Sequence, residues 1–177
     1  KHSQSGTITH VRRVISAQRE EDRYKNMRKS YIVSAKRTAI GSFLGGLATV
    51  KPKDMGSAVV KALLEDAKVA PENVDEVICG NVLSAGLGQN IGRTIALEAG
   101  IPETVCAHSV NMVCGSGLRT VMEAVMSIQC GFNDIVVAGG VESMSGAPYL
   151  LPANTRTGHK MGTFTAVDHK IYDAPTT

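Results

Sequence analysis

The chain has 177 residues, of which 43% are hydrophobic and 20% charged, the composition of one ordinary globular domain. Its net charge of +3 is uneven, because residues 1–30 hold eight Lys/Arg against three Asp/Glu and the rest hold eleven against thirteen. A slightly acidic body with 4% aromatic residues argues against nucleic-acid binding, and no run of about 20 apolar residues predicts a membrane span.

Residues 1–29 are predicted to be an added or disordered leader. They show no periodic apolar face, and the run Arg19–Arg23 is entirely charged. Met27 is typical of a natural start, so residues 1–26 are interpreted as upstream read-through or attached sequence. A mitochondrial presequence is the alternative, although the acidic run at 20–22 argues against it.

From residue 31 the chain alternates strand-like and helix-like segments. Strands are predicted at Tyr31–Ser34, Val74–Leu83, Val105–Val113 and Ile135–Ala138. Helices are predicted at 55–68 with Asp54 as its cap, at 90–99, and from about Leu118 to a C-terminal cap at Gly131. This alternation predicts an α/β fold with a mainly parallel sheet over residues 30–145, followed by a loop-rich region at 146–177.

The first and last predicted helices each carry an apolar stripe at i, i+3, i+4, i+7 and i+8, which predicts their buried faces. The stripes consist of Met55, Ala58, Val59, Ala62 and Leu63, and of Leu118, Val121, Met122, Val125 and Met126.

Cys114 is the candidate nucleophile. It lies where an apolar strand runs into Cys114-Gly115-Ser116-Gly117 and then into a helix. Unpaired N–H groups at a helix start act as roughly half a positive charge, which favours a reactive thiolate and can stabilise an oxyanion. The alternative, which the residues alone leave open, is that Cys114 is a small packed hydrophobe.

The other candidate groups are assigned structural roles. Cys79, Cys106 and Cys130 lie in apolar runs or near a helix end and are predicted to be packed, and the spacings between the four cysteines give no C-x-x-C zinc pair. Reduced thiols and a cytoplasmic location are therefore expected.

His108 is interpreted as a satisfied strand histidine, and His159 and His169 as solvated. Gly86-Leu87-Gly88 lacks the third glycine of a dinucleotide fingerprint because Ile91 stands there, so no nucleotide cofactor and no metal are predicted.

The segment Asn111–Leu118 resembles the acyl-carrying cysteine motif of the thiolases, and its C-G-S-G form is most like that of the biosynthetic acetyl-CoA acetyltransferases. Val33–Phe43 is similar to the family's opening strand and loop. Gly80–Arg93 resembles its G-x-V-x-x-A-G-x-G-Q-N segment, with Ile91-Gly92 in place of the usual Pro-Ala. Ala138–Ser145 is similar to its A-G-G-x-E-S-M-S strand end, and Lys160-Met161-Gly162 resembles part of its tetramerisation loop.

The resemblance implies a thiolase-like layered fold, of which residues 30–145 are the first half of an αβαβα sandwich and 146–177 the start of a loop and tetramerisation region. It implies that Cys114 accepts an acetyl group from acetyl-CoA and that a second acetyl-CoA attacks it, giving acetoacetyl-CoA, and it also implies the reverse reaction, thiolysis of acetoacetyl-CoA. Coenzyme A thioesters would be substrates, with no further cofactor, and a homo-oligomer or a missing C-terminal half is the expected partner.

The family's G-H-P and C-x-G-G motifs do not occur in this sequence. We therefore expect an incomplete enzyme with little or no turnover as an isolated chain. Two alternatives remain: a non-catalytic fragment or assembly half with a structural Cys114, and a related condensing enzyme that uses a carrier-protein substrate.

Overall fold

A computed structural model describes residues 27–172, and the predicted leader lies outside them except for its last three residues. The first described helix is α3 (Pro52–Ala67), followed by the short η1 (Pro71–Asn73). Then come β1 (Glu76–Gly80), α4 (Ile91–Glu98), β2 (Cys106–Val110), α5 (Ser116–Gln129) and β3 (Val136–Gly140). The chain continues through β4 (Tyr149–Leu150), η2 (Ala153–Thr157), β5 (Val167–Asp168) and α6 (His169–Tyr172).

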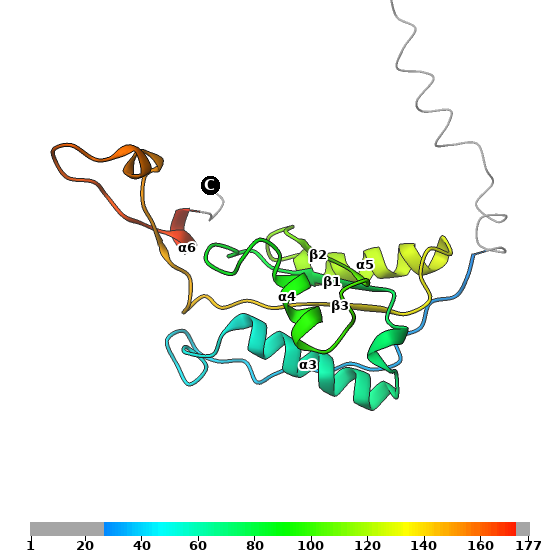
Figure 1. The fold of residues 1–177 in the computed structure, drawn as a ribbon. Coiled ribbons are helices and arrows are strands. Elements are labelled where there is room, and N and C mark those ends of the chain that lie inside the picture. Colours follow the sequence, from blue (N-terminus) through cyan, green and yellow to red (C-terminus); the bar gives the residue numbers. More distant parts are fainter. Residues whose placement is uncertain (1–26, 173–177) are drawn as a thin grey trace, which may run out of the picture.

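The three longer strands form a parallel sheet in the order β2-β1-β3, with α3 and α4 on one face and α5 on the other (Figure 1). Because β2 and β3 lie on opposite sides of β1, the two crossovers run in opposite directions. Right-handed crossovers of this kind place α4 and α5 on opposite faces of the sheet. The reversal creates a topological switch point between the carboxyl ends of β1 and β3, where open α/β sheets bind their ligands.

The hydrophobic core lies between the sheet and the α3–α4 layer. Val77 of β1 is 1% exposed and packs with Ile95 of α4 and with Leu64 of α3. Gly56 brings α3 close to α4, since a Cβ there would lie 2.4 Å from the Cδ1 atom of Ile95. The predicted α/β class and parallel sheet are therefore confirmed.

Two predicted features of α3 are wrong. Lys51 is the N-cap residue and Pro52 occupies the first turn, so Asp54 lies inside the helix. Proline suits that position because its missing N–H has no intrahelical partner there anyway. The buried face is made by Pro52, Ser57, Val60 and Leu64, one step around the helix from the predicted stripe.

Helix α5 has the predicted extent but turns the opposite face to the sheet. Its buried residues are Ser116, Thr120 and Ala124, whereas Leu118 is 69% and Met122 48% exposed. The face with small side chains is buried because glycine residues of β1 and β3 let the helix backbone approach the sheet closely. The Thr120 hydroxyl donates to the Gly117 carbonyl at 2.7 Å and also contacts the Gly139 carbonyl at 3.1 Å.

The end of α5 agrees with the prediction. Gly131 has φ +77°, and its N–H donates to Ile128 O at 3.1 Å while the Phe132 N–H donates to Ser127 O at 3.0 Å. This pair of bonds is the Schellman pattern, in which glycine accepts the left-handed conformation after the helix.

Because the apolar stripe of α5 is exposed, replacing one of its residues by a polar one should hardly change the stability of the chain. Met122→Gln is expected to change the free energy of unfolding by less than about 0.5 kcal/mol, because the side chain is half exposed and both residues favour helices. Ala124→Gln is the matched control on the buried face, where overpacking costs about 1–3 kcal/mol. Urea denaturation measures both variants, and a large loss for Met122→Gln would contradict the exposed assignment.

The predicted strand Tyr31–Ser34 is wrong. Ile32 is 81% exposed, and no backbone hydrogen bond joins this segment to the sheet within residues 27–172. Side-chain contacts tether it instead, since the Ser34 hydroxyl donates to Asp66 at 2.6 Å and the Lys36 ammonium lies 2.9 Å from the same carboxylate. Two predicted strands are also too long, because β1 ends at Gly80 and β2 at Val110.

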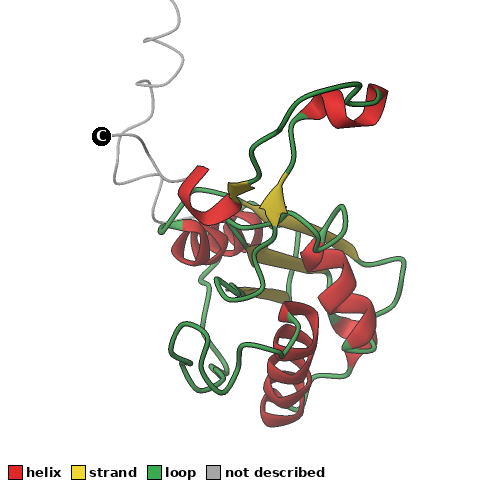
Figure 2. Ribbon diagram, turned by 90° about the vertical axis from the view of Figure 1, so that its left-hand side faces the viewer, coloured by secondary structure: helices red, strands yellow, loops and turns green. Residues whose placement is uncertain are grey.

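The loop-rich region contains more structure than predicted. Strands β4 and β5 pair antiparallel, and the arm between them, with η2, projects away from the layered body (Figure 2). His159 is exposed as predicted, but His169 is 5% exposed, so its prediction as a solvated residue is wrong. The burial follows from the hairpin, where the His169 N–H donates to Pro148 O at 3.2 Å.

Candidate active site

Cys114 is exposed and lies in the turn between β2 and α5, two residues before the helix begins at Ser116. Val113, just before it, has φ +51°. This left-handed conformation is a genuine outlier for a β-branched residue, and such strain persists only where the surrounding structure enforces it. The strained turn presents the thiol at the start of the helix, as the sequence predicts.

The Ser116 hydroxyl holds this turn in place. It accepts a hydrogen bond from the Met112 N–H at 2.8 Å and donates to the Val113 carbonyl at 2.6 Å. The Asn111 side-chain carbonyl accepts from the Val113 N–H at 3.0 Å. Ser116 is 4% exposed, so its hydroxyl acts in a setting where these bonds have little competition from water.

Ser116→Ala is expected to lower the free energy of unfolding by about 1–2 kcal/mol, since it leaves the Met112 N–H without its partner. It should also change the alkylation rate of Cys114, because the turn is no longer held. Thr120→Val is the control, as it removes the other buried hydroxyl of α5 at similar volume. We expect it to lower stability similarly with no effect on Cys114. Equal alkylation rates in both variants would contradict the role of Ser116.

Donors for a developing negative charge lie at the start of α5, the helix that follows the thiol. Within the described residues, no backbone carbonyl accepts from the N–H groups of Gly117 or Leu118, which are in the first turn of α5. Such groups carry the positive end of the helix dipole. The predicted oxyanion-stabilising role of this helix start remains a prediction.

Cys114 lines a cavity of about 530 Å³ at the topological switch point of the sheet. One wall follows β1 and includes Asn81 and Leu83, and another follows β3 and includes Glu142. Gly117 and Lys170 also line it. The sequence predicts the thiol but not the cavity, because its walls come from segments that are distant along the chain.

The remaining cysteines differ in their surroundings. Burial raises the pKa of the Cys79 thiol to about 11, with the bond to Val141 opposing the rise and the Glu142 charge adding to it. Cys79 is therefore a neutral packed thiol at physiological pH, as predicted. Cys106 and Cys130 are exposed, so their prediction as packed residues is wrong. Both lie at element boundaries, where an apolar neighbourhood in sequence does not ensure burial.

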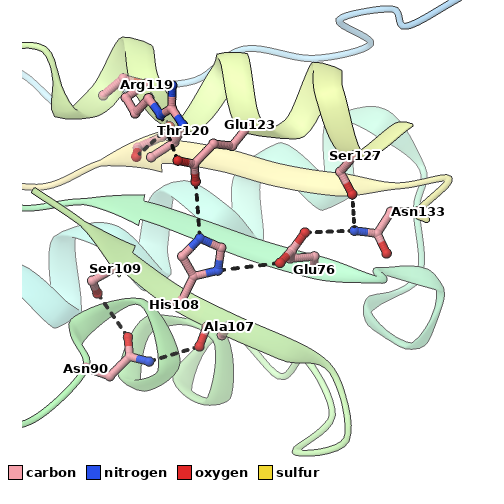
Figure 3. A network of polar contacts seen from close by, with 12 residues as sticks. Glu76, Asn90, Ala107, His108, Ser109, Arg119, Thr120, Glu123, Ser127 and Asn133 are labelled. Carbon is pink, nitrogen blue, oxygen red and sulfur yellow. Dashed lines mark hydrogen bonds and ion pairs between the residues drawn. The ribbon is translucent and has the colours of Figure 1, made fainter. Parts of the chain in front are cut away.

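His108 belongs to a separate polar network (Figure 3). Its Nδ1 atom lies 3.4 Å from a carboxylate oxygen of Glu76, and its Nε2 atom lies 3.3 Å from one of Glu123. The Asn133 amide also donates to Glu76, at 2.7 Å. The interpretation of His108 as a satisfied strand histidine is confirmed, and it is not among the residues that line the Cys114 cavity.

Arg119 donates to Glu123 at 2.8 Å, and this bond is the main cause of the lowered pKa of Glu123, with His108 adding to it. A lowered folded-state pKa stabilises the protein at pH above the unfolded value of about 4.3, and this stabilisation disappears as pH falls through the folded value. Glu123→Gln is therefore expected to lower the free energy of unfolding by roughly 0.5–1 kcal/mol at neutral pH.

The difference between Glu123→Gln and the unchanged chain should shrink as the pH falls below about 4 in urea denaturation series. Glu72→Gln is the control, because within the described residues the exposed Glu72 carboxylate has no hydrogen bond or ion pair. A difference that stays constant down to low pH would contradict the assigned pair.

Residues 30–176 match the family model described as thiolase, N-terminal domain. An acetyl-CoA acetyltransferase of Escherichia coli (strain K12) is 52% identical over 147 residues, covering 83% of this chain and 36% of that protein. The cytosolic acetyl-CoA acetyltransferase of Mus musculus is 53% identical over 145 residues, covering 82% and 36%. The crystal structure of the Bacillus anthracis acetyl-CoA acetyltransferase superposes with a TM-score of 0.79 at 36% identity, covering 84% and 37%.

A parallel layered sheet with an exposed thiol at a strand-to-helix turn defines an α/β protein with a cysteine-centred candidate site. This chain belongs to the thiolase family and corresponds to its N-terminal domain. The predicted resemblance and the thiolase-like layered fold are thereby confirmed. The chain spans about 36% of the length of these curated relatives. Within residues 27–172, none of the helices is long and apolar enough to cross a membrane.

Proposed function

We propose that the chain performs the acyl-accepting step of an acetyl-CoA acetyltransferase, with Cys114 as the catalytic nucleophile. The observation that carries this proposal is an exposed thiol that lines a cavity on a strained turn, just before a helix whose first N–H groups have no backbone acceptor within the described residues. Relatives called acetyl-CoA acetyltransferases, at about half identity, support acetyl-CoA as the substrate.

In the proposed step the Cys114 thiol gives its proton to water, and the resulting thiolate attacks the thioester carbonyl carbon of acetyl-CoA. A new sulfur–carbon bond forms, and the negative charge moves to the carbonyl oxygen, where the Gly117 and Leu118 N–H groups can stabilise it. The bond to the coenzyme A sulfur then breaks, and coenzyme A leaves as a thiolate that takes a proton from water. No further cofactor or metal enters this step.

The complete reaction also needs a base to remove a proton from the acetyl carbon of a second acetyl-CoA before it attacks the acetyl-enzyme, giving acetoacetyl-CoA. The described residues that line the cavity include two ionisable side chains besides Cys114, namely Glu142 and Lys170. The Glu142 carboxylate already accepts three hydrogen bonds, and Lys170 lies 3.5 Å from Asp168 and over the Phe43 ring. We therefore infer that this chain accepts one acetyl group from acetyl-CoA but does not sustain turnover, in condensation or in thiolysis.

Turnover would require further polypeptide to supply this base. It could be a segment equivalent to the rest of the relatives, or another chain. The exposed apolar stripe of α5, with Leu118, Met122 and Met126, supports such association because large apolar patches mark interaction surfaces. Homo-oligomerisation is the other arrangement that would cover it. A cytoplasmic location is proposed as well, since three relatives are named cytosolic enzymes.

The deciding experiment treats the chain with acetyl-CoA labelled in its acetyl group and locates the label by peptide mass spectrometry. We expect up to one acetyl group per chain, on Cys114, with release of an equal amount of coenzyme A. Cys106 and Cys130 are internal controls because they are also exposed. Equal labelling of the three thiols, or none on Cys114 in the folded chain, would favour the alternative of a non-catalytic chain with a structural cysteine. Labelling only by an acyl carrier protein would favour a related condensing enzyme.

A further inference from the structure

The loop that follows β1 forms an anion-binding nest, and a carboxylate of the same chain fills it. Glu142, two residues beyond β3, accepts at Oε1 from the Asn81 amide at 3.0 Å and from the Leu83 N–H at 3.1 Å. Its Oε2 atom accepts from the Val82 N–H at 2.9 Å. Successive N–H groups that point at one anion are the arrangement by which proteins bind phosphates and carboxylates.

This nest connects the two strands that border the switch point. The Val141 N–H donates to Gly80 O at 3.0 Å, and the Asn81 amide donates to Val141 O at 3.0 Å. Asn81 is 3% exposed and its side-chain oxygen has no partner within the described residues, so its side chain is held by the two amide bonds, to Val141 O and to Glu142 Oε1. The carboxylate of Glu142 is therefore the group that completes the hydrogen bonding of this wall.

The same wall borders the thiol. Gly80, Asn81, Val82 and Leu83 line the cavity together with Cys114, and Glu142 lines it from the β3 side. Because Cys114 lines this cavity, a group attached to its sulfur would share it with residues 81–83, and their position would set the space available to that group. A movement of about 1 Å in such a wall can change a reaction rate by 10- to 100-fold.

We propose that Glu142 is a positioning residue of the Cys114 site: its carboxylate fills the nest of residues 81–83 and holds the cavity open beside the thiol. It acts through the backbone and touches no reacting atom. The proposal deepens the proposed function, because an acyl group would occupy that space. The role of Glu142 is tested by alkylation, without acyl chemistry, so that this role and the proposed acyl transfer can fail separately.

A carboxylate is required by the donors present. Three N–H groups point at two oxygen atoms, and both oxygens of an ionised carboxylate accept. In Glu142→Gln one oxygen becomes an NH₂ group that faces a backbone N–H, so at least one donor loses its partner. Glu142→Ala removes the anion and leaves a nest that formate, a small carboxylate, can enter.

The test measures alkylation of Cys114 by the small reagent iodoacetamide and by the bulkier N-phenylmaleimide, with Cys106 and Cys130 in the same molecule as internal standards. We expect Glu142→Gln and Glu142→Ala to slow N-phenylmaleimide at Cys114 about tenfold, with iodoacetamide changed less than about twofold. Added formate should restore the rate of N-phenylmaleimide at Cys114 in Glu142→Ala but not in Glu142→Gln. Chloride should restore this rate in neither variant. Glu72→Gln, which changes an exposed carboxylate, should match the unchanged chain.

The proposal would be overturned if the variants slowed both reagents equally, or if formate did not restore the N-phenylmaleimide rate of Glu142→Ala. Glu142 would then be a structural residue. If Glu142→Ala does not fold, Glu142→Asp replaces it, since its shorter carboxylate fills only part of the nest. An intermediate N-phenylmaleimide rate then supports the proposal, and an unchanged rate overturns it. If the unchanged chain takes no acetyl group from acetyl-CoA, the proposed function fails, while the alkylation ratio still decides the role of Glu142.

Discussion

Cys114→Ala is expected to reduce acetyl incorporation from acetyl-CoA by at least about 10³-fold, because it removes the only atom proposed to form the acyl bond. Folding should be unaffected, since the side chain is exposed and makes no hydrogen bond within the described residues. Incorporation is measured as labelled acetyl group per chain, at matched concentrations of folded protein.

Cys106→Ala is the matched control. Cys106 is also exposed, but it begins β2 rather than the turn before α5. Its removal should leave acetyl incorporation within about twofold of the unchanged chain. If the two variants lose incorporation equally, acetylation is unspecific chemistry of exposed thiols, and the geometry around Cys114 has no catalytic value.

The contrast between these cysteines shows what the sequence could predict about the site. The order strand, Cys-Gly-Ser-Gly, helix predicts a thiol at a helix start because it depends only on neighbours in the chain. The hydroxyl of Ser116 could have been anticipated from the same turn, as serine near helix starts commonly bonds to the backbone. Glu142 could not, since its donors are about sixty residues earlier and meet it only when β1 pairs with β3.

The same distinction explains the fold. Helix existence follows from periodicity, so α3, α4 and α5 were predictable from local sequence. The buried face was not, because it depends on the partner surface. In α5 the large apolar residues Leu118 and Met122 are the ones a sequence pattern assigns to the core. The residues that are buried are instead Ser116, Thr120 and Ala124, which are small enough to pack closely against the glycines of the sheet. The segment Tyr31–Ser34 likewise has strand-like residues, but it makes no backbone hydrogen bond to a strand within the part of the chain that the structure describes.

Gly80→Ala is expected to destabilise the chain by roughly 2–3 kcal/mol. A Cβ atom at Gly80 would lie 2.7 Å from the carbonyl carbon of Ser116 and 2.8 Å from the nitrogen of Gly117. Both are backbone atoms of the first turn of α5, so no side-chain rotation relieves the clash, and overpacking of this kind costs about 1–3 kcal/mol. The free energy of unfolding from urea denaturation measures it.

Gly139→Ala is the matched control, because a Cβ there meets no atom within 4 Å although Gly139 pairs with Cys79 on the adjacent strand. It should change the free energy of unfolding by less than about 1 kcal/mol, with some stabilisation from a less flexible unfolded chain. Gly80→Ala should in addition slow alkylation of Cys114, since the turn that presents the thiol is attached to the helix that must move. Equal stability of the two variants would mean that α5 does not lie this close to β1, and the small buried face of α5 would lose its explanation.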